Sequence, residues 1–115
     1  MITMVINDSP YGNERPYNAL RLAMALVRQG ETDLRIFLMG DAVVCGLAGQ
    51  STPQGYYNLG RMVESVARHG GEVALCGSCV EARGLKGASL VEGAAIGNMA
   101  QLAQWTVEAE KVVVF

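Results

Sequence analysis

The chain has 115 residues, of which 50% are hydrophobic and 17% are charged, and its formal net charge is −2 at pH 7. It has no basic run and only 6% aromatic residues, which argues against a nucleic-acid-binding protein. No apolar stretch approaches the roughly 20 residues of a membrane-spanning helix, and the first residues lack the basic and long apolar regions of a signal peptide.

The first three predicted elements are a strand, a helix and a strand. Residues 2–6 (ITMVI) and 34–39 (LRIFLM) are apolar runs typical of buried strands. A helix is predicted within residues 18–30, ending at Gly30. Its apolar side chains recur every three or four positions: Leu20, Ala23, Met24 and Val27.

A second helix is predicted within residues 51–71, ahead of a third strand at 72–76 (EVALC). Its apolar stripe consists of Leu59, Met62, Val63 and Val66. Ser51 or Thr52 is expected to cap its start, with Pro53 in the first turn.

The last third of the chain continues the alternation. A short helix is expected to open at Cys79 and to be followed by a strand at 89–93 (SLVEG). The next helix begins with a pattern that resembles a capping box, formed by Asn98 and Gln101. Residues 111–115 (KVVVF) form the last predicted strand.

This order predicts one α/β domain over residues 1–115, built as a three-layer α/β/α sandwich on a five-stranded, mostly parallel sheet with flavodoxin-like architecture. The strands at 2–6, 34–39, 72–76 and 111–115 are expected to be buried on both faces. In such sheets, sites form beyond the carboxyl ends of the strands. The segments expected to meet there are 8–15, 41–50, 77–84 and 92–98.

One of these segments carries the most distinctive motif, "CGSCVEARG" at residues 76–84. Cys76 ends a predicted strand, and Ser78 with Glu81 matches a capping box for a short helix. Cys79 then occupies the first helical position, where backbone N–H groups favour a thiolate.

Arg83 lies four residues after Cys79, on the same face of the predicted helix. Its guanidinium group is placed to pair with an anion held on the Cys79 sulfur. Such an electropositive strand-to-helix corner is typical of a nucleophilic cysteine. The alternative is that Cys76 is simply buried and that Cys79 has no chemical role.

The same motif allows two other kinds of site. A closed zinc site usually takes four ligands, and the only further candidates are Cys45 and His69, both distant in the sequence. His69 is expected to lie at a helix C-terminus, where histidine complements the helix dipole. A thioredoxin-like redox pair is the second alternative, although no proline is placed to act as its cis-proline. We expect no metal and no cofactor.

Two further segments at this edge of the sheet each allow two interpretations. Cys45 either approaches Cys79 or is a small buried side chain. The loop "NDSPYGNERP", from Asp8 to Arg15 in its polar part, is a possible phosphate or flavin cradle, but it matches neither phosphate-binding glycine motif and is equally typical of turn chemistry.

The low charge also bears on assembly and location. Charged residues fall below the usual value of about 25%, so we expect part of the apolar surface to be covered by further copies of the chain. The lack of a signal peptide favours a cytoplasmic protein with reduced cysteines.

Four stretches in this order resemble the DsrE/DsrF-like family of small sulfur-metabolism proteins, over nearly the whole chain. They are the strand–loop–helix at 2–30, "FLMGDAV" at 37–43, "CGSCVEARG" at 76–84 and "GNMAQLAQWTVEAEKVVVF" at 97–115. The C-x-x-C-x-x-x-R-G core is the most specific of them. The resemblance implies a parallel five-stranded sandwich that assembles into homotrimers or homohexamers.

It also implies a sulfur carrier, in which a cysteine takes sulfane sulfur from a donor protein as a persulfide and passes it to an acceptor protein. The family's active cysteine corresponds to Cys79 and its arginine to Arg83. Cys76 occurs only in some members, and its expected role is that of a resolving thiol. Two other functions stay open: a small-molecule-binding or regulatory module of the same fold, and a C-x-x-C thiol–disulfide redox protein.

Overall fold

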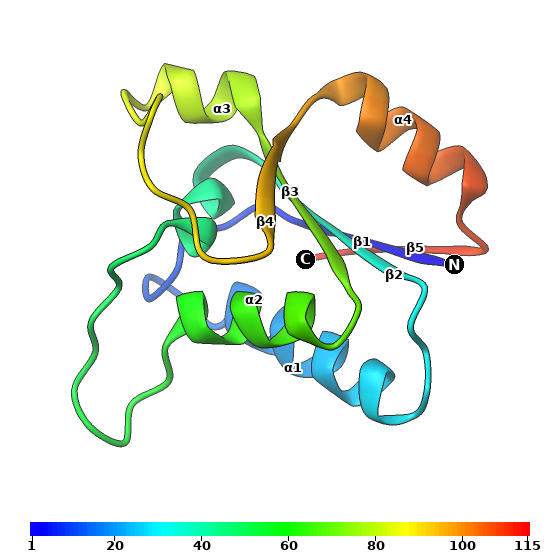
Figure 1. The fold of residues 1–115 in the computed structure, drawn as a ribbon, viewed down its shortest axis with the longest axis horizontal. Helices are drawn as coiled ribbons and strands as arrows, with labels where there is room; N and C mark the ends of the chain where they lie inside the picture. The colour runs from blue at the N-terminus through cyan, green and yellow to red at the C-terminus, as the bar shows by residue number, and fades with distance from the viewer.

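A computed structural model describes all of residues 1–115. Strands and helices alternate along the chain as predicted, with one additional 3₁₀ helix (Figure 1). The elements in chain order are β1 (Ile2–Ile6), α1 (Arg15–Arg28), β2 (Leu34–Leu38), η1 (Gly40–Gly46), α2 (Leu59–Arg68), β3 (Glu72–Cys76), α3 (Gly77–Ala82), β4 (Ala94–Gly97), α4 (Met99–Glu108) and β5 (Lys111–Val114).

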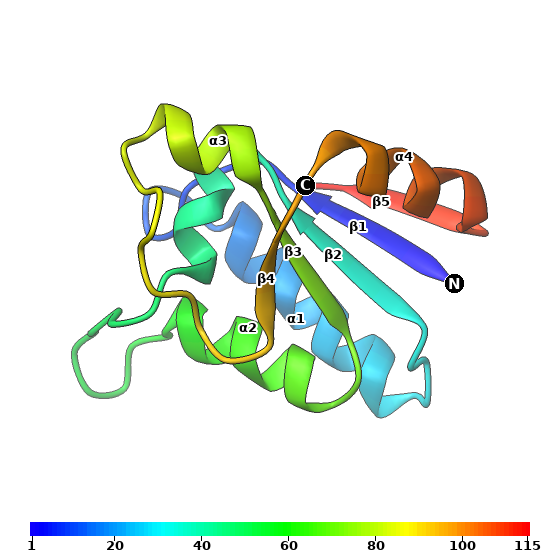
Figure 2. The same ribbon diagram turned by 45° about the horizontal axis from the view of Figure 1, so that its top comes forward.

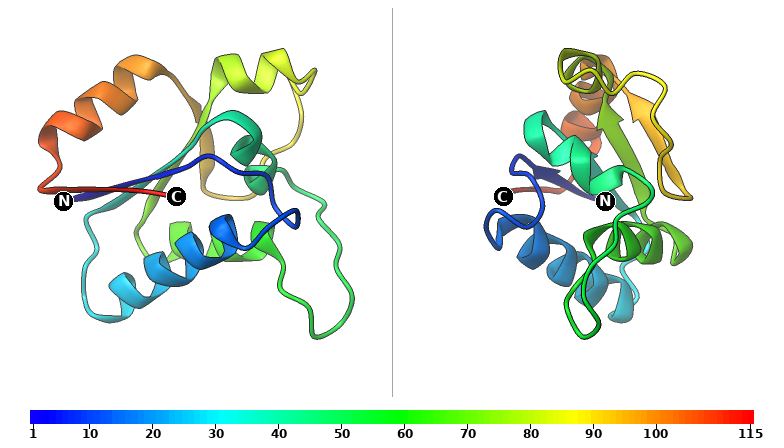
Figure 3. Two further views of the ribbon diagram at one scale, coloured as in Figure 1. Left: turned by 180° about the vertical axis from the view of Figure 1, so that it is seen from behind. Right: turned by 90° about the vertical axis from the view of Figure 1, so that its left-hand side faces the viewer.

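The five strands form one sheet in the order β4-β3-β2-β1-β5, and every neighbouring pair is parallel. Helices α1 and α2 cover one face of the sheet, and α4 lies on the other face with α3 above the strand ends (Figure 2). The view from behind shows the same two helical layers on either side of the sheet (Figure 3). The predicted three-layer α/β fold is therefore confirmed.

The core lies between the central strands and α1 and α2. Side chains of β1, β2 and β3 are buried on both faces of the sheet, as predicted; the largest of them are Met4, Ile6, Leu34, Ile36, Phe37, Leu38 and Leu75. The prediction of a doubly buried strand was wrong for β5, where Val112 is 43% and Val114 is 63% exposed. The reason is position, because β5 pairs only with β1 and forms an edge of the sheet.

The predicted strand at 89–93 was also wrong, because β4 is Ala94–Gly97. Instead, Leu90 forms an isolated antiparallel bridge with Leu47, and the backbone N–H of Val91 donates to the carbonyl of Gly46. Residues 89–93 thus pair with the end of η1 and not with β3. Part of the segment 92–98 expected beyond the strand ends is therefore the fourth strand itself.

Helix caps follow the sequence in one case and depart from it in another. Asn98 caps α4 as predicted, accepting a hydrogen bond from the backbone N–H of Gln101. Helix α2 is capped by Asn58 and not by Ser51 or Thr52, so Pro53 lies in the loop before it. The Asn58 amide also donates to the Gln50 carbonyl, which fixes where this loop ends and the helix begins.

Helix α4 is attached to its face of the sheet through its single tryptophan. The Trp105 ring packs edge-on against Phe37, and the buried Thr3 hydroxyl donates to the Trp105 carbonyl at 3.1 Å. This contact joins the last third of the chain to β1 and β2. None of the helices has the length and apolar character needed to cross a membrane.

Candidate functional site

The motif at residues 76–84 forms a tight corner between β3 and α3. Helix α3 begins at Gly77, two residues earlier than predicted, so Cys79 lies in its first turn and Ser78 is not its cap. A Cβ atom on Gly77 would lie 3.1 Å from the Gly97 carbonyl oxygen and from an Ile96 methyl group. Glycine therefore allows the chain to turn directly from the strand into the helix beside the end of β4.

This corner brings the two cysteine sulfurs together. The Cys79 thiol donates to the Cys76 sulfur, and the two Sγ atoms lie 2.7 Å apart. Cys76 is only 4% exposed, whereas Cys79 is partly exposed. Cys79 is thus the sulfur that a second molecule can reach, and Cys76 lies behind it.

The Cys79 sulfur also receives a hydrogen bond from outside the motif. The backbone N–H of Gly40, at the start of η1, points to Cys79 Sγ at 3.2 Å. Gly40 has a φ of 60°, a left-handed conformation that favours glycine. The second residue after β2 therefore directs a backbone donor at a sulfur on α3.

The hydrogen bond between the two thiols shifts their pKa values in opposite directions. Burial raises the pKa of the Cys76 thiol, but hydrogen bonds from Cys79 and Ser78 outweigh burial, and the pKa of Cys76 lies below its ordinary value. Burial and the hydrogen bond to Cys76 raise the pKa of Cys79, against the lowering effect of the Gly40 N–H and the Arg83 charge. Of the two thiols, Cys76 is therefore the one that loses its proton at the lower pH.

Arg83 lies beside this pair but contacts a different anion. Its Nε and Nη2 atoms donate to Asp41 Oδ1 at 3.0 and 2.7 Å, and its Nη1 donates to the Cys79 carbonyl oxygen at 3.0 Å. The guanidinium group does not bond to the Cys79 sulfur. It acts on that thiol through its charge and ties α3 to η1.

The remaining candidates lie outside this group. Cys45 is fully buried in η1, and burial raises the pKa of its thiol to about 12, so it behaves as a small core side chain. His69 follows α2 at the opposite end of the sheet, where its Nδ1 lies 2.7 Å from the Ser65 carbonyl oxygen. No group of three or more histidine, cysteine or acidic side chains is arranged to hold a metal ion.

The polar loop after β1 bonds mainly to itself and to α2. Arg15 pairs with Asp8 at 3.3 Å, and its backbone N–H donates to the Asn13 side chain. Tyr11 donates to Gln50 Oε1 at 2.6 Å and accepts from the Leu59 N–H. These contacts fasten the loop to the start of α2, while a ligand in it stays a prediction.

Sequence reasoning missed two residues of the site, Gly40 and Asp41. Both follow the second strand, in or beside the segment expected at the site edge, so the parallel topology gave a signal for their location. Nothing in the sequence indicated that Gly40 would turn its N–H towards Cys79 or that Asp41 would take the Arg83 guanidinium.

Comparison with known proteins agrees with the fold and covers the whole chain. The profile of the DsrE/DsrF-like family matches residues 1–115. Protein YchN of Escherichia coli K12 is 45% identical over 99% of this chain and 97% of its own length. An uncharacterised protein of Methanopyrus kandleri is 39% identical over all of this chain and 93% of its own length.

Two solved structures are also similar. The crystal structure of the E. coli YchN protein superimposes with a TM-score of 0.92, at 46% identity over 99% of this chain and 97% of that one. A conserved protein of unknown function from Bacteroides thetaiotaomicron has a TM-score of 0.68 at 14% identity, covering 99% of this chain and 94% of that one, and so shares the fold. With a family match and relatives of this identity along its full length, the chain belongs to the DsrE/DsrF-like family.

Proposed function

We propose that this protein is a sulfur carrier in which Cys79 takes sulfane sulfur as a persulfide and passes it to the thiol of a partner. One observation carries the proposal: the reachable Cys79 sulfur lies between the Gly40 N–H, at 3.2 Å, and the buried Cys76 sulfur, at 2.7 Å. This arrangement supplies a nucleophile, a hydrogen-bond donor for its charge and a second thiol behind it.

Loading requires the Cys79 thiolate. Cys76, whose sulfur already accepts the Cys79 hydrogen bond at 2.7 Å, takes the Cys79 proton as the donor persulfide approaches. The Cys79 thiolate attacks the outer sulfur of the donor persulfide, forming a new S–S bond as the donor's S–S bond breaks. The electron pair of the broken bond leaves with the donor cysteine as a thiolate.

The loaded sulfur carries a negative charge. The Gly40 N–H and the Arg83 charge, which both lower the pKa at Cys79, favour an anion at this position. Transfer follows when an acceptor thiolate attacks the outer sulfur and Cys79 leaves as a thiolate. Alternatively, Cys76 passes its proton to the outer sulfur of the persulfide and attacks the Cys79 sulfur, which releases hydrosulfide and leaves a Cys76–Cys79 disulfide for an external thiol to reduce.

The proposal also covers the cellular compartment, the partner proteins and the oligomeric state. We place this sulfur trafficking in the cytoplasm, between a donor and an acceptor protein, on a homotrimer or homohexamer. The exposed apolar side chains Val107, Val112 and Val114 support contact with further copies of the chain. The chemistry runs through cysteine sulfur alone and calls for neither a metal nor a cofactor.

The test is intact-mass spectrometry after incubation with a low-molecular-weight persulfide. The wild-type protein is expected to gain one sulfur atom, and cyanide treatment to remove it as thiocyanate. Cys45→Ser is the matched control, because Cys45 is buried away from the pair and its variant should load as the wild type does. A Cys79→Ser variant that gained sulfur equally well would disprove the assignment of the carrier cysteine.

A second candidate function is thiol–disulfide exchange without sulfur transfer. It is favoured by the 2.7 Å between the Cys76 and Cys79 sulfurs, which is close to bonding distance. A reversible Cys76–Cys79 disulfide with a defined reduction potential, in a protein that gains no sulfur from persulfide donors, would select this function.

A further inference from the structure

The arginines of the chain divide into two groups by their partners. Four of the seven pair with a carboxylate within 4 Å: Arg15, Arg35, Arg68 and Arg83. The other three, Arg21, Arg28 and Arg61, have no acidic partner, and all three are exposed. Arg21 bonds only to the neutral Asn18 side chain and lies over the Tyr17 ring. In a chain of net charge −2, these three charges are uncompensated locally.

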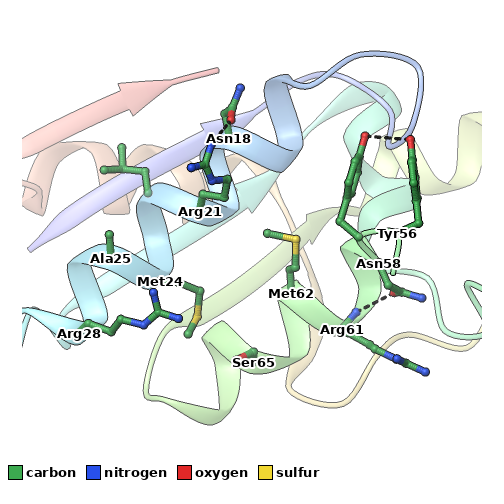
Figure 4. A pocket seen from close by; sticks show the side chains of 12 residues that line it. Asn18, Arg21, Met24, Ala25, Arg28, Tyr56, Asn58, Arg61, Met62 and Ser65 are labelled. Atoms are coloured by element: carbon green, nitrogen blue, oxygen red, sulfur yellow. Dashed lines mark hydrogen bonds between the residues drawn. The ribbon is translucent and has the colours of Figure 1, made fainter. Parts of the chain in front are cut away.

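All three line one groove. It lies between α1 and α2, on the face of the sheet opposite α4, and has a volume of about 770 Å³ (Figure 4). Arg21 and Arg28 come from α1, and Arg61 comes from α2. No aspartate or glutamate lines the groove. It is therefore a site of purely positive charge.

The middle of the groove is apolar. Met24 of α1 and Met62 of α2 lie between the two helices (Figure 4), and Leu22 and Ala25 also line the groove. Methionine side chains adapt their shape to a partner, which makes them frequent in binding grooves. The groove thus combines an apolar floor with arginines around it.

The spacing of the arginines indicates the size of the occupant. Arg21 and Arg28 are seven residues apart, which is about two helical turns or roughly 10 Å along α1. Arg61 lies on the other helix, and its side chain extends away from α1 (Figure 4). An amphipathic helix laid along the groove repeats its carboxylates over the same distance and can meet each arginine in turn.

We propose that this groove docks an acidic amphipathic segment of a partner protein, with apolar side chains on Met24 and Met62 and carboxylates on the three arginines. A second copy of the chain fits less well, because the acidic residues nearest its exposed α4–β5 surface are already paired. Glu108 bonds to Arg35, and Glu110 lies 3.9 Å from the terminal amino group. The proposal does not depend on the cysteine chemistry.

The test uses a fluorescein-labelled helical peptide of about 18 residues, or five turns, with leucine every third or fourth position and glutamate on both flanks. A matched peptide carries glutamine in place of glutamate. Fluorescence anisotropy is expected to show that the acidic peptide binds more tightly than the glutamine peptide and loses affinity as salt rises. The triple variant Arg21→Gln/Arg28→Gln/Arg61→Gln is expected to bind at least about tenfold more weakly.

Arg68→Gln is the matched control, because Arg68 lies on α2 but pairs with Glu64 outside the groove. It should bind the acidic peptide as the wild type does, and circular dichroism checks that all variants fold. A second variant, Met62→Glu, places a carboxylate on the groove floor and is expected to abolish binding.

Five results would overturn the proposal. Absence of binding to the acidic peptide, or equal affinity for both peptides or for the triple variant, excludes an acidic segment. Displacement of the peptide by tripolyphosphate at equimolar concentration assigns the groove to a small polyanion instead. Self-association that is lost in the triple variant but kept in Arg68→Gln, measured by sedimentation, assigns it to a second copy.

Discussion

Arg83 and Asp41 form a two-point contact, with Arg83 Nε and Nη2 both donating to Asp41 Oδ1. This contact holds η1 against α3 and leaves the arginine beside the Cys79 sulfur without bonding to it. The pair is open to solvent, since the Arg83 and Asp41 side chains are 32% and 67% exposed. We therefore expect it to matter more for the charge at Cys79 than for the stability of the fold.

A substitution of Arg83 and a substitution of Asp41 should move the Cys79 pKa in opposite directions. Arg83→Gln removes a charge that lowers this pKa, so the pKa should rise. Asp41→Asn removes the competing carboxylate and frees the guanidinium for the sulfur, so the pKa should fall. Thiolate absorbance near 240 nm, followed against pH, measures both changes.

The melting temperature provides the control for this pair. An exposed ion pair contributes about 1 kcal/mol or less, so both variants should unfold within a few degrees of the wild type. If the Cys79 pKa moved in the same direction in both variants, the competition between Asp41 and the sulfur for Arg83 would be ruled out.

Replacing Cys76 separates loading from release. Cys76→Ser keeps Cys79 and its Gly40 donor but removes the thiol that lies behind it. We expect this variant to gain sulfur more slowly, because Cys76 no longer takes the Cys79 proton, and to retain it longer than the wild type, because the route through a Cys76–Cys79 disulfide is closed. Hydrosulfide release, measured by the methylene-blue reaction, should drop to background. Release at the wild-type rate would mean that Cys76 is not the resolving thiol.

Gly40→Ala tests the backbone donor. A Cβ at this position would lie 3.6 Å from the Asn7 carbonyl oxygen, so there is space for it, but the φ of 60° is strained for alanine by about 1–2 kcal/mol. Relief of this strain turns the N–H away from Cys79. The pKa of Cys79 should rise and the rate of sulfur loading at neutral pH should fall.

Gly30→Ala is the reference for this substitution. Gly30 follows α1 with a φ of 89°, and a Cβ added there would meet nothing within 4 Å. Gly30→Ala therefore introduces the same kind of backbone strain, but far from the site. Its stability should fall by a similar amount while its loading rate stays at the wild-type value. Equal loading by Gly40→Ala and Gly30→Ala would show that the Gly40 N–H has no part in the chemistry.

Cys45 makes stability depend on alkaline pH. Its thiol pKa is raised from 9.0 to about 12 by burial, so the folded chain keeps a proton that the unfolded chain loses. The stabilisation is complete below pH 9 and is lost as the pH rises from 9 towards 12, by up to about 1.4 kcal/mol per pH unit. Urea unfolding of wild type and Cys45→Ala across this range should give a shallower decline for the variant. Parallel declines would contradict the assignment, whatever the absolute stability of Cys45→Ala.

The extent to which the sequence predicted the molecule varies with the kind of interaction. Dense apolar runs identified β1, β2 and β3, since burial on both faces leaves a strong pattern. The short strand β4, with the sequence Ala-Ala-Ile-Gly, has no such run, and the prediction fell instead on residues 89–93, which contain the larger side chains Leu90 and Val91. The exposure of β5 depends on strand order, which the sequence alone does not specify.

The contacts of the site also differ in how far the sequence predicted them. The proximity of Cys76 and Cys79 follows from local spacing, and it was predictable because one turn of chain connects them. The contact of Gly40 with Cys79 and that of Asp41 with Arg83 join residues about 40 positions apart. Parallel topology placed these segments at one edge, but only the three-dimensional arrangement shows which donor meets which acceptor.

The two sulfurs of the corner are separated by only two residues in the chain. A disulfide between them would close a very small ring, and such a ring restricts the unfolded chain far less than a long one does. In the chain-entropy account, such a ring stabilises the fold by about 2 kcal/mol, less than half of what a 100-residue loop gives. The oxidation state of the corner is therefore only weakly coupled to the stability of the fold that presents it.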